Sequence, residues 1–185
     1  VDIICPQQRP QMATVKPGVF VVPHVKKHRQ GQIVTVSPRL DDGLFRARTL
    51  EITEQQGTEL PIEEADVVVA AGWGVNALGN MDMVRELAET LGGAVAGTRP
   101  VLDKGWIAAD RMIGQSGKVI GPNLFISLGA SGAMHFTTGF ERAKFVLAVD
   151  QNPQAPIFQA ADVGIVGDLR EVLPCLIEQV QKLKS

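Results

Sequence analysis

The chain has 185 residues, which is enough for one domain of ordinary size with a short additional segment. Apolar residues make up 45% of the sequence and charged residues 21%, a balance that is typical of folded globular proteins. The formal net charge of -2 offers no basic surface to a phosphate backbone, which excludes nucleic acid as an expected partner. No apolar run reaches the ~20 residues that cross a bilayer, and the start has no signal-peptide pattern. We therefore expect a cytoplasmic protein without direct membrane insertion.

The first thirty residues are expected to form an extended arm, because prolines spread along them interrupt any helix. After this arm, residues 32–36 alternate between apolar and polar side chains as a half-buried strand does. Residues 45–52 alternate again after a turn at 41–43, so the two segments predict a β-hairpin before the main sheet. We expect residues 1–30 to be a linker and residues 31–185 to form one domain.

Beyond the predicted hairpin, short apolar runs alternate with helical segments. The expected strands are residues 66–71, 94–97, 124–128, 145–149 and 163–166. One helix is expected to start after Asn80, and a longer one is expected over 168–184, with Asp168 as its cap and Pro174 inside it. Strands that alternate with helices predict a doubly wound, Rossmann-like α/β fold, a three-layer sandwich with a parallel sheet between helices.

In such a sheet, ligands bind beyond the carboxyl ends of the strands, so the residues that follow each strand are the candidate site. Residues 72–77 read Gly-Trp-Gly-Val-Asn-Ala after the first strand, but no acidic residue closes the next strand, as a nicotinamide site requires. The other interpretation of these glycines is a tight strand-to-helix turn. Thr98 and Arg99 follow the second strand, where a guanidinium can hold phosphate, lie against a flat ring, or simply be solvated.

Two further loops carry small and polar residues. Residues 114–117 (Gly-Gln-Ser-Gly) can present N–H donors to a phosphate or a polar ring edge, although the Walker spacing is absent. Residues 131–133 lead into an expected helix N-terminus, which is a natural seat for a pyrophosphate. A hydrolase built on Ser131 and His135 is the competing interpretation, and the absence of a G-x-S-x-G elbow argues against it.

Carboxylates end the last two expected strands. Asp150 follows the fourth strand and Asp168 follows the fifth. Both can accept hydrogen bonds from ribose hydroxyls or an adenine amino group. Asp168 also has the capping role, which needs no ligand.

Taken together, these motifs resemble the alpha subunit of electron transfer flavoproteins, including the members associated with nitrogen fixation. The segments that carry the resemblance are residues 9–20, 97–106, 114–118, 128–133, 155–162 and 164–169. The resemblance implies that residues 31–185 are a C-terminal FAD-binding domain and that residues 1–30 lead from an N-terminal domain. It also implies a bacterial electron carrier rather than a substrate-converting enzyme. Its partners would be a beta subunit, with which it forms a heterodimer, and a dehydrogenase of the acyl-CoA type as electron donor.

The resemblance also assigns roles to single residues. Arg99 would lie by the flavin ring, Gln115 and Ser116 would reach the flavin or its linker, residues 131–133 would hold the pyrophosphate, and Asp150 and Asp168 would hold the adenosine end. The cofactor-binding residues that we expect are Thr98, Arg99, Gly114, Gln115, Ser116, Gly117, Ser131, Gly132, Ala133, His135, Asp150, Asp168 and Leu169.

Four positions depart from the family pattern. Trp73 stands where the family usually has arginine, His135-Phe136 stands where it has a Gln-His pair, and Asp150 stands where it has asparagine. These departures keep two alternatives open. One is a nucleotide-binding domain for AMP or NAD that has lost its flavin redox function. The other is an NAD-using enzyme with His135 as its catalytic histidine.

Overall fold

The structure is a computed structural model, and it divides the chain into two compact units. It describes residues 6–7, 9–14, 31–37, 47, 50, 60–78 and 81–184. The larger unit comprises Val1–Val19 with Glu59–Ser185, and the smaller unit is Phe20–Thr58. The predicted division into an arm over 1–30 and a domain over 31–185 stays a prediction.

In the smaller unit, residues 31–37 are exposed and carry no regular secondary structure. The first strand of the predicted hairpin, at 32–36, is therefore not formed in the structure. The second, at 45–52, lies almost entirely outside the described residues. Alternation predicts a strand only where a core covers the apolar side chains, and residues 31–37 face none.

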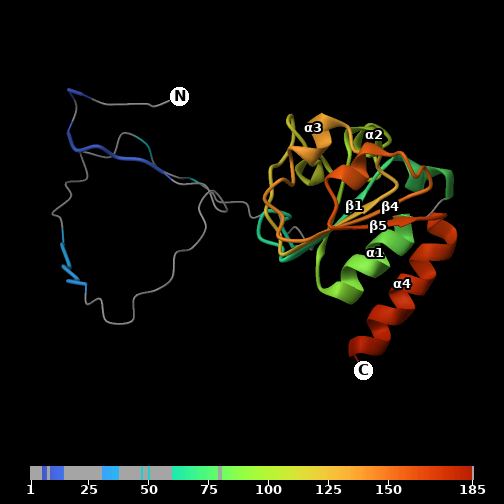
Figure 1. Ribbon diagram of the computed structural model, residues 1–185. Helices are drawn as coiled ribbons and strands as arrows, with labels where there is room; N and C mark the ends of the chain where they lie inside the picture. Colours follow the sequence, from blue (N-terminus) through green and yellow to red (C-terminus); the bar gives the residue numbers. More distant parts are fainter. Residues whose placement is uncertain are drawn as a thin grey trace. The chain divides into compact units, whose positions relative to one another are not determined.

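The larger unit is built on five parallel strands in the order β2-β1-β3-β4-β5 (Figure 1). They are β1 (Val67–Ala71), β2 (Ala94–Gly97), β3 (Leu124–Leu128), β4 (Val146–Asp150) and β5 (Val163–Val166). Each strand lies within one residue of its predicted position, which confirms the parallel α/β sheet. In this strand order the chain reverses direction across the sheet between β1 and β3, the place where such sheets bind ligands.

Two long helices cover one face of the sheet. Helices α1 (Met81–Leu91) and α4 (Leu169–Lys184) pack against each other, as Figure 1 shows. Their buried residues belong to one apolar cluster with the sheet residues Val69 and Ile126. No helix in the described part of the chain combines the length and apolarity that a membrane crossing requires.

The other face of the sheet is covered by short elements and loops. Helix α3 (Met134–Thr137) and the 3-10 helix η4 (Pro156–Gln159) contribute Phe136 and Ile157 to a second apolar cluster around Phe125. The three-layer prediction therefore holds, with one thick helical layer and one thin layer. Between strands, helix α2 (Arg99–Asp103) and the 3-10 helices η2 (Trp73–Leu78) and η3 (Ala109–Arg111) cross the carboxyl edge.

Both long helices end or begin as the sequence predicts. Asp168 caps α4, because its Oδ1 accepts the backbone N–H of Arg170 at 2.9 Å. Gly92, with a φ of 68°, ends α1, and the N–H of Gly93 donates to the carbonyl of Ala88 at 2.8 Å. The other predicted cap, Asn80, lies outside the described residues.

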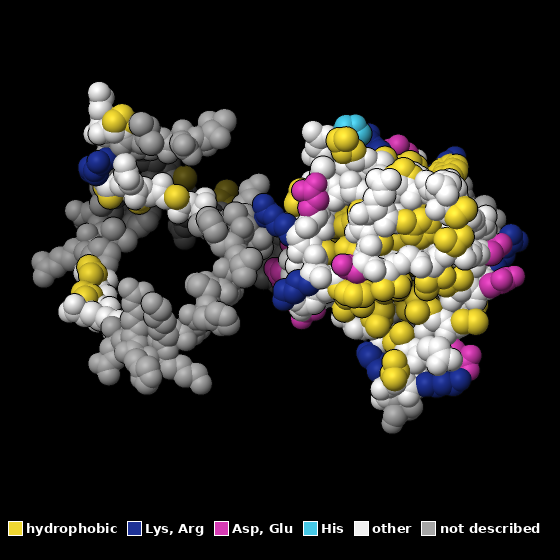
Figure 2. Space-filling view, in the orientation of Figure 1, with side chains coloured by type: hydrophobic (Ala, Val, Ile, Leu, Met, Phe, Trp, Pro, Cys, Tyr) yellow, Lys and Arg dark blue, Asp and Glu magenta, His cyan; other side chains and the backbone are white. Residues whose placement is uncertain are grey.

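β5 is the outer strand of the sheet and leaves apolar surface uncovered. Val163 is 45% exposed and Val166 is 56% exposed. Ile165 of the same strand lines an apolar groove with Val172 and Leu176 of α4. Figure 2 shows the hydrophobic side chains gathered on this side of the larger unit. Exposed apolar surface of this kind often marks a contact with another protein.

A row of small residues crosses the sheet near its carboxyl edge. The register neighbours in this row are Ala96, Ala70, Ser127, Ala148 and Gly164. Small side chains here leave room above the sheet for the loops that follow the strands. Ser127 is the polar member, and its Oγ is buried without a hydrogen-bond partner in the described residues. An unpartnered buried hydroxyl costs about 1–3 kcal/mol.

We predict that Ser127→Ala raises the free energy of unfolding by about 1 kcal/mol, because it removes the unpartnered hydroxyl and keeps the small volume. Urea denaturation of both proteins measures the difference. Ser131→Ala, at an exposed serine, is the control and should change stability by less than about 0.5 kcal/mol. A clear loss of stability in Ser127→Ala would contradict the interpretation, since it would mean that the hydroxyl has a bonding partner.

Candidate functional site

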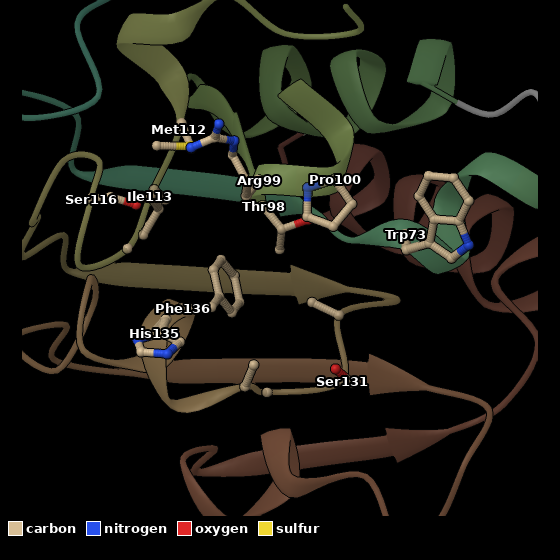
Figure 3. Close-up of a pocket in the computed structure, with 14 residues that line it drawn as sticks. Trp73, Thr98, Arg99, Pro100, Met112, Ile113, Ser116, Ser131, His135 and Phe136 are labelled. Atoms are coloured by element: carbon tan, nitrogen blue, oxygen red, sulfur yellow. The ribbon is translucent and has the colours of Figure 1, made fainter. Parts of the chain in front are cut away.

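A pocket of about 190 Å³ lies at the carboxyl end of the sheet, beside the switch point between β1 and β3 (Figure 3). Its walls come from four separate segments of the chain. They are Trp73 after β1, residues 98–100 after β2, residues 112–116, and residues 130–136 after β3. This is the edge at which an open parallel sheet binds its ligands.

Eight of the predicted site residues line this pocket. They are Thr98, Arg99, Gly114, Ser116, Ser131, Gly132, Ala133 and His135. The fold thus brings together three loops that lie far apart in the sequence, although their roles in cofactor binding stay predictions. Sequence reasoning had not assigned six further lining residues to the site: Trp73, Pro100, Met112, Ile113, Ala130 and Phe136.

The backbone of residues 131–133 presents free donors at the pocket. None of these three N–H groups donates a hydrogen bond to another group in the described part of the chain. The loop is held from behind, because the N–H of Ile157 donates to the carbonyl of Ser131 at 3.0 Å. The helix that was expected after these residues is only about one turn long, since α3 has four residues. Its dipole is therefore small, and the loop N–H groups are the main anion-binding feature.

Arg99 and Thr98 form the wall that α2 contributes. The Nε of Arg99 donates to Oδ1 of Asp103 at 2.8 Å. Thr98 stands at the N-cap position of α2, yet its side chain makes no capping bond, and its buried Oγ1 has no partner among the described residues. Buried hydroxyls of this kind usually bond a partner, and Thr98 lines the pocket.

The loop of residues 114–117 is locked onto α3. Oε1 of Gln115 accepts from Nδ1 of His135 at 2.6 Å, and the N–H of Gln115 donates to the carbonyl of His135 at 2.7 Å. Gly114 has a φ of 135°, and a Cβ there would lie 2.5 Å from the His135 carbonyl oxygen. Gly117 packs as tightly against the carbonyl of Met112. Both glycines are therefore required by packing, whatever the loop binds.

The fourteen lining residues include one guanidinium and no carboxylate. Together with the free N–H groups, this charge pattern suits an anionic ligand group such as a phosphate. The other lining residues include the apolar side chains of Met112, Ile113 and Phe136. Phe136 is buried and packs against Phe140, with ring centroids 5.2 Å apart, where the resemblance leads one to expect a histidine.

Trp73 forms the outer rim of the pocket and is 51% exposed. Its ring stacks on Trp106 with a centroid distance of 6.2 Å, and Nζ of Lys104 lies 5.7 Å from its centroid. The flanking glycines pack on the turn after β3, since the N–H of Gly74 donates to the carbonyl of Gly129 at 2.9 Å. The geometry favours the tight-turn interpretation of residues 72–77 over a dinucleotide loop.

Asp150, Asp168 and Leu169 lie outside the pocket. Oδ1 of Asp150 accepts the N–H of Asn152 at 2.8 Å, and Asp168 forms an ion pair with Arg170 at 3.0 Å. The carbonyl of Asp150 accepts the N–H of Gly167 at 3.1 Å, so the two carboxylates stand on adjacent loops. Leu169 is buried in the cluster beneath α4. Their predicted contacts with the adenosine end stay predictions.

The family described as "Electron transfer flavoprotein FAD-binding domain" matches residues 61–141, a range that contains every segment lining the pocket. The chain is thus related to the alpha subunits of electron transfer flavoproteins. Asp150, Asp168 and Leu169 lie beyond the matched range.

Three relatives match nearly the whole chain. "Electron transfer flavoprotein subunit alpha" of Thermoanaerobacterium thermosaccharolyticum is 40% identical over 98% of this chain and 55% of that protein. "Acryloyl-CoA reductase electron transfer subunit beta" of Anaerotignum propionicum is 34% identical over 99% of this chain and 51% of that protein. "Lactate dehydrogenase (NAD(+),ferredoxin) subunit LctC" of Acetobacterium woodii is 35% identical over 97% of this chain and 43% of that protein. The chain thus spans about half the length of these relatives.

We predict that Gly132→Ala lowers the free energy of unfolding of this domain by more than about 2 kcal/mol. Gly132 has a φ of 87°, and a Cβ there would lie 2.2 Å from the backbone nitrogen of Ile157. Gly92→Ala is the matched control, because its φ of 68° is also positive but nothing lies within 4 Å of the added Cβ. It should cost roughly 1 kcal/mol, the strain of a left-handed residue alone. Equal losses in urea denaturation would contradict the packing argument.

A second prediction concerns the stability of the folded chain at low pH. The hydrogen bond from the Arg170 side chain holds the pKa of Asp168 below its ordinary value of 3.8. The interaction therefore stabilises the folded chain above pH 3.8 and is lost as the pH falls through the lower folded-state pKa. Asp168→Asn keeps an N-capping oxygen but removes the titrating charge. The midpoint of thermal unfolding, measured from pH 6 downward, should therefore fall less in the variant than in the unchanged chain. An equal fall in both proteins would contradict the stabilising role of the Asp168 charge.

Proposed function

We propose that this chain is the FAD-binding part of an electron transfer flavoprotein alpha subunit, which carries electrons from a dehydrogenase of the acyl-CoA type to an acceptor. The observation that carries the proposal is the composition of the pocket. Arg99 and Thr98 line one pocket with residues 131–133, whose backbone N–H groups have no partner among the described residues. The hydroxyl of Thr98 likewise has no partner there, and the described lining includes no carboxylate.

These residues fit a diphosphate-linked flavin. The N–H groups of residues 131–133 would bind the diphosphate, because they are preorganised donors that no group in the described residues uses. The Thr98 hydroxyl would donate to the same cofactor. Asp150 and Asp168 follow β4 and β5 along the same edge of the sheet, where they would accept hydrogen bonds from the adenosine end.

The protein's part in the redox chemistry would be electrostatic. Bound FAD supplies the one-electron and two-electron redox chemistry. Arg99 would place a fixed positive charge beside the ring and so stabilise negative charge that develops there. The apolar walls formed by Met112, Ile113 and Phe136 would exclude water and strengthen that interaction.

The names of the relatives support electron transfer in a multi-subunit system, since one is an electron transfer subunit of an acryloyl-CoA reductase. We propose a beta subunit as the direct partner, in a heterodimer that covers the cofactor. The exposed apolar groove between β5 and α4 is available for such a contact. The cytoplasmic location is part of the same proposal.

A second candidate function is a nucleotide-binding domain that takes AMP or NAD without flavin chemistry. Two features favour it: Phe136 makes an apolar wall where the resemblance leads one to expect histidine, and Trp73 occupies the rim. This candidate retains the diphosphate and adenosine contacts and needs nothing at the ring end. The two functions therefore differ in whether the flavin ring adds affinity to the ADP part of the ligand.

We predict that Arg99→Gln weakens FAD binding about tenfold or more and leaves ADP binding nearly unchanged, because the guanidinium would contact only the ring end of the proposed cofactor. Calorimetric titration of the chain with each ligand, alone and co-purified with its beta subunit, measures both. Arg142→Gln is the control. Arg142 is exposed and lies beside Gly121, and Gly121 precedes β3 at the amino edge of the sheet, opposite to the carboxyl edge that holds the pocket.

Each outcome of this titration decides between the candidates. FAD that binds more tightly than ADP in an Arg99-dependent way supports the flavoprotein function. Equal affinities for FAD and ADP favour the nucleotide-binding domain. A chain and heterodimer that bind neither ligand would rule out both.

A further inference from the structure

The contact between Arg99 and Asp103 has a consequence for the proposed cofactor site. We propose that Asp103 is a positioning residue that holds the Arg99 guanidinium in the orientation in which it meets the ligand. The inference rests on the proposed flavin function and extends it to a residue outside the pocket lining.

The two side chains lie on one face of a single helical turn. Arg99 begins α2 and Asp103 ends it, and the i,i+4 spacing brings Nε to 2.8 Å from Oδ1. The turn itself is fixed. Val101 between them is fully buried, and its N–H donates to the carbonyl of Thr98 at 3.1 Å. Asp103 therefore stands on a rigid base from which it can orient a long side chain.

The ion pair contributes little to folding. The side chains of Arg99 and Asp103 are 64% and 58% exposed, and exposed ion pairs add little to stability. The pair instead restricts the orientation of the Arg99 side chain. Among the described residues, no other hydrogen bond holds the Arg99 guanidinium. Since Nε is used by Asp103, both terminal nitrogens remain available for the pocket.

An arginine without this contact would sample many rotamers and lose that freedom when it binds. Ordering such a side chain on binding costs affinity, which a preformed contact avoids. In Figure 3, Arg99 lies on the wall of the pocket next to Thr98 and Met112. Asp103 would thus act before the ligand arrives, by keeping the guanidinium at that wall.

Two substitutions separate this positioning role from the effect of charge. Asp103→Asn and Asp103→Ala remove the same negative charge, but only asparagine keeps an oxygen that can accept from Nε. We expect Asp103→Asn to bind FAD nearly as the unchanged chain does and Asp103→Ala to bind it about three- to tenfold more weakly. The absorbance spectrum of the bound flavin should likewise be retained in the asparagine variant and altered in the alanine variant. In an Arg99→Gln background, the difference between the two variants should disappear.

Glu178→Gln and Glu178→Ala are the matched control pair. Glu178 pairs with Lys182 at i,i+4 spacing, both side chains are 61% exposed, and the pair lies in the distal half of α4. Neither control should change FAD affinity. Equal FAD affinities and spectra for the two Asp103 variants would overturn the positioning role while leaving the flavin function intact. A parent chain that binds no FAD, even with its beta subunit, would overturn both.

Discussion

The carboxyl edge of this domain depends on backbone contact between the turns that follow β1 and β3. The N–H of Gly72 donates to the carbonyl of Leu128 at 2.8 Å, and a Cβ on Gly72 would lie 2.3 Å from the carbonyl oxygen of Gly129. No side chain fits between the two turns. This approach aims residues 130–136 over the sheet and fixes one wall of the pocket. The same glycines that suggest a dinucleotide loop therefore act by letting two turns touch.

The pocket has one wall with positive potential and one apolar wall. Free N–H groups and Arg99 supply positive potential, and no carboxylate among the described lining residues opposes it. This potential suits a phosphate and a ring that gains negative charge. Buried apolar residues such as Ile113 and Phe136 supply a dry environment in which those charges act strongly. The proposed flavin function needs both walls, and the proposed role of Asp103 concerns only the orientation of the charged one.

The sequence predicted the sheet well because strands buried on both faces read as continuous apolar runs, as Val67–Ala71 does. It predicted poorly where a segment forms regular structure only if another part of the protein packs against it. Residues 32–36 alternate like a strand but face no core, and residues after Ser131 suggest a helix that lasts one turn. Met112 and Ile113 were missed because they lie in an irregular segment, where no periodicity marks a wall. Asp150 and Asp168 fell outside the pocket because β4 and β5 lie one and two strands beyond β3.

We propose that the backbone N–H groups of one loop bind the diphosphate of a dinucleotide. Amide chemical shifts of the isotope-labelled chain, followed during a titration with FAD, measure this binding residue by residue. We expect the largest shifts at residues 131–133 and at Thr98, and we expect ADP alone to reproduce those at 131–133. Shifts confined to the groove between β5 and α4, or amides 131–133 that do not respond to saturating FAD, would contradict it.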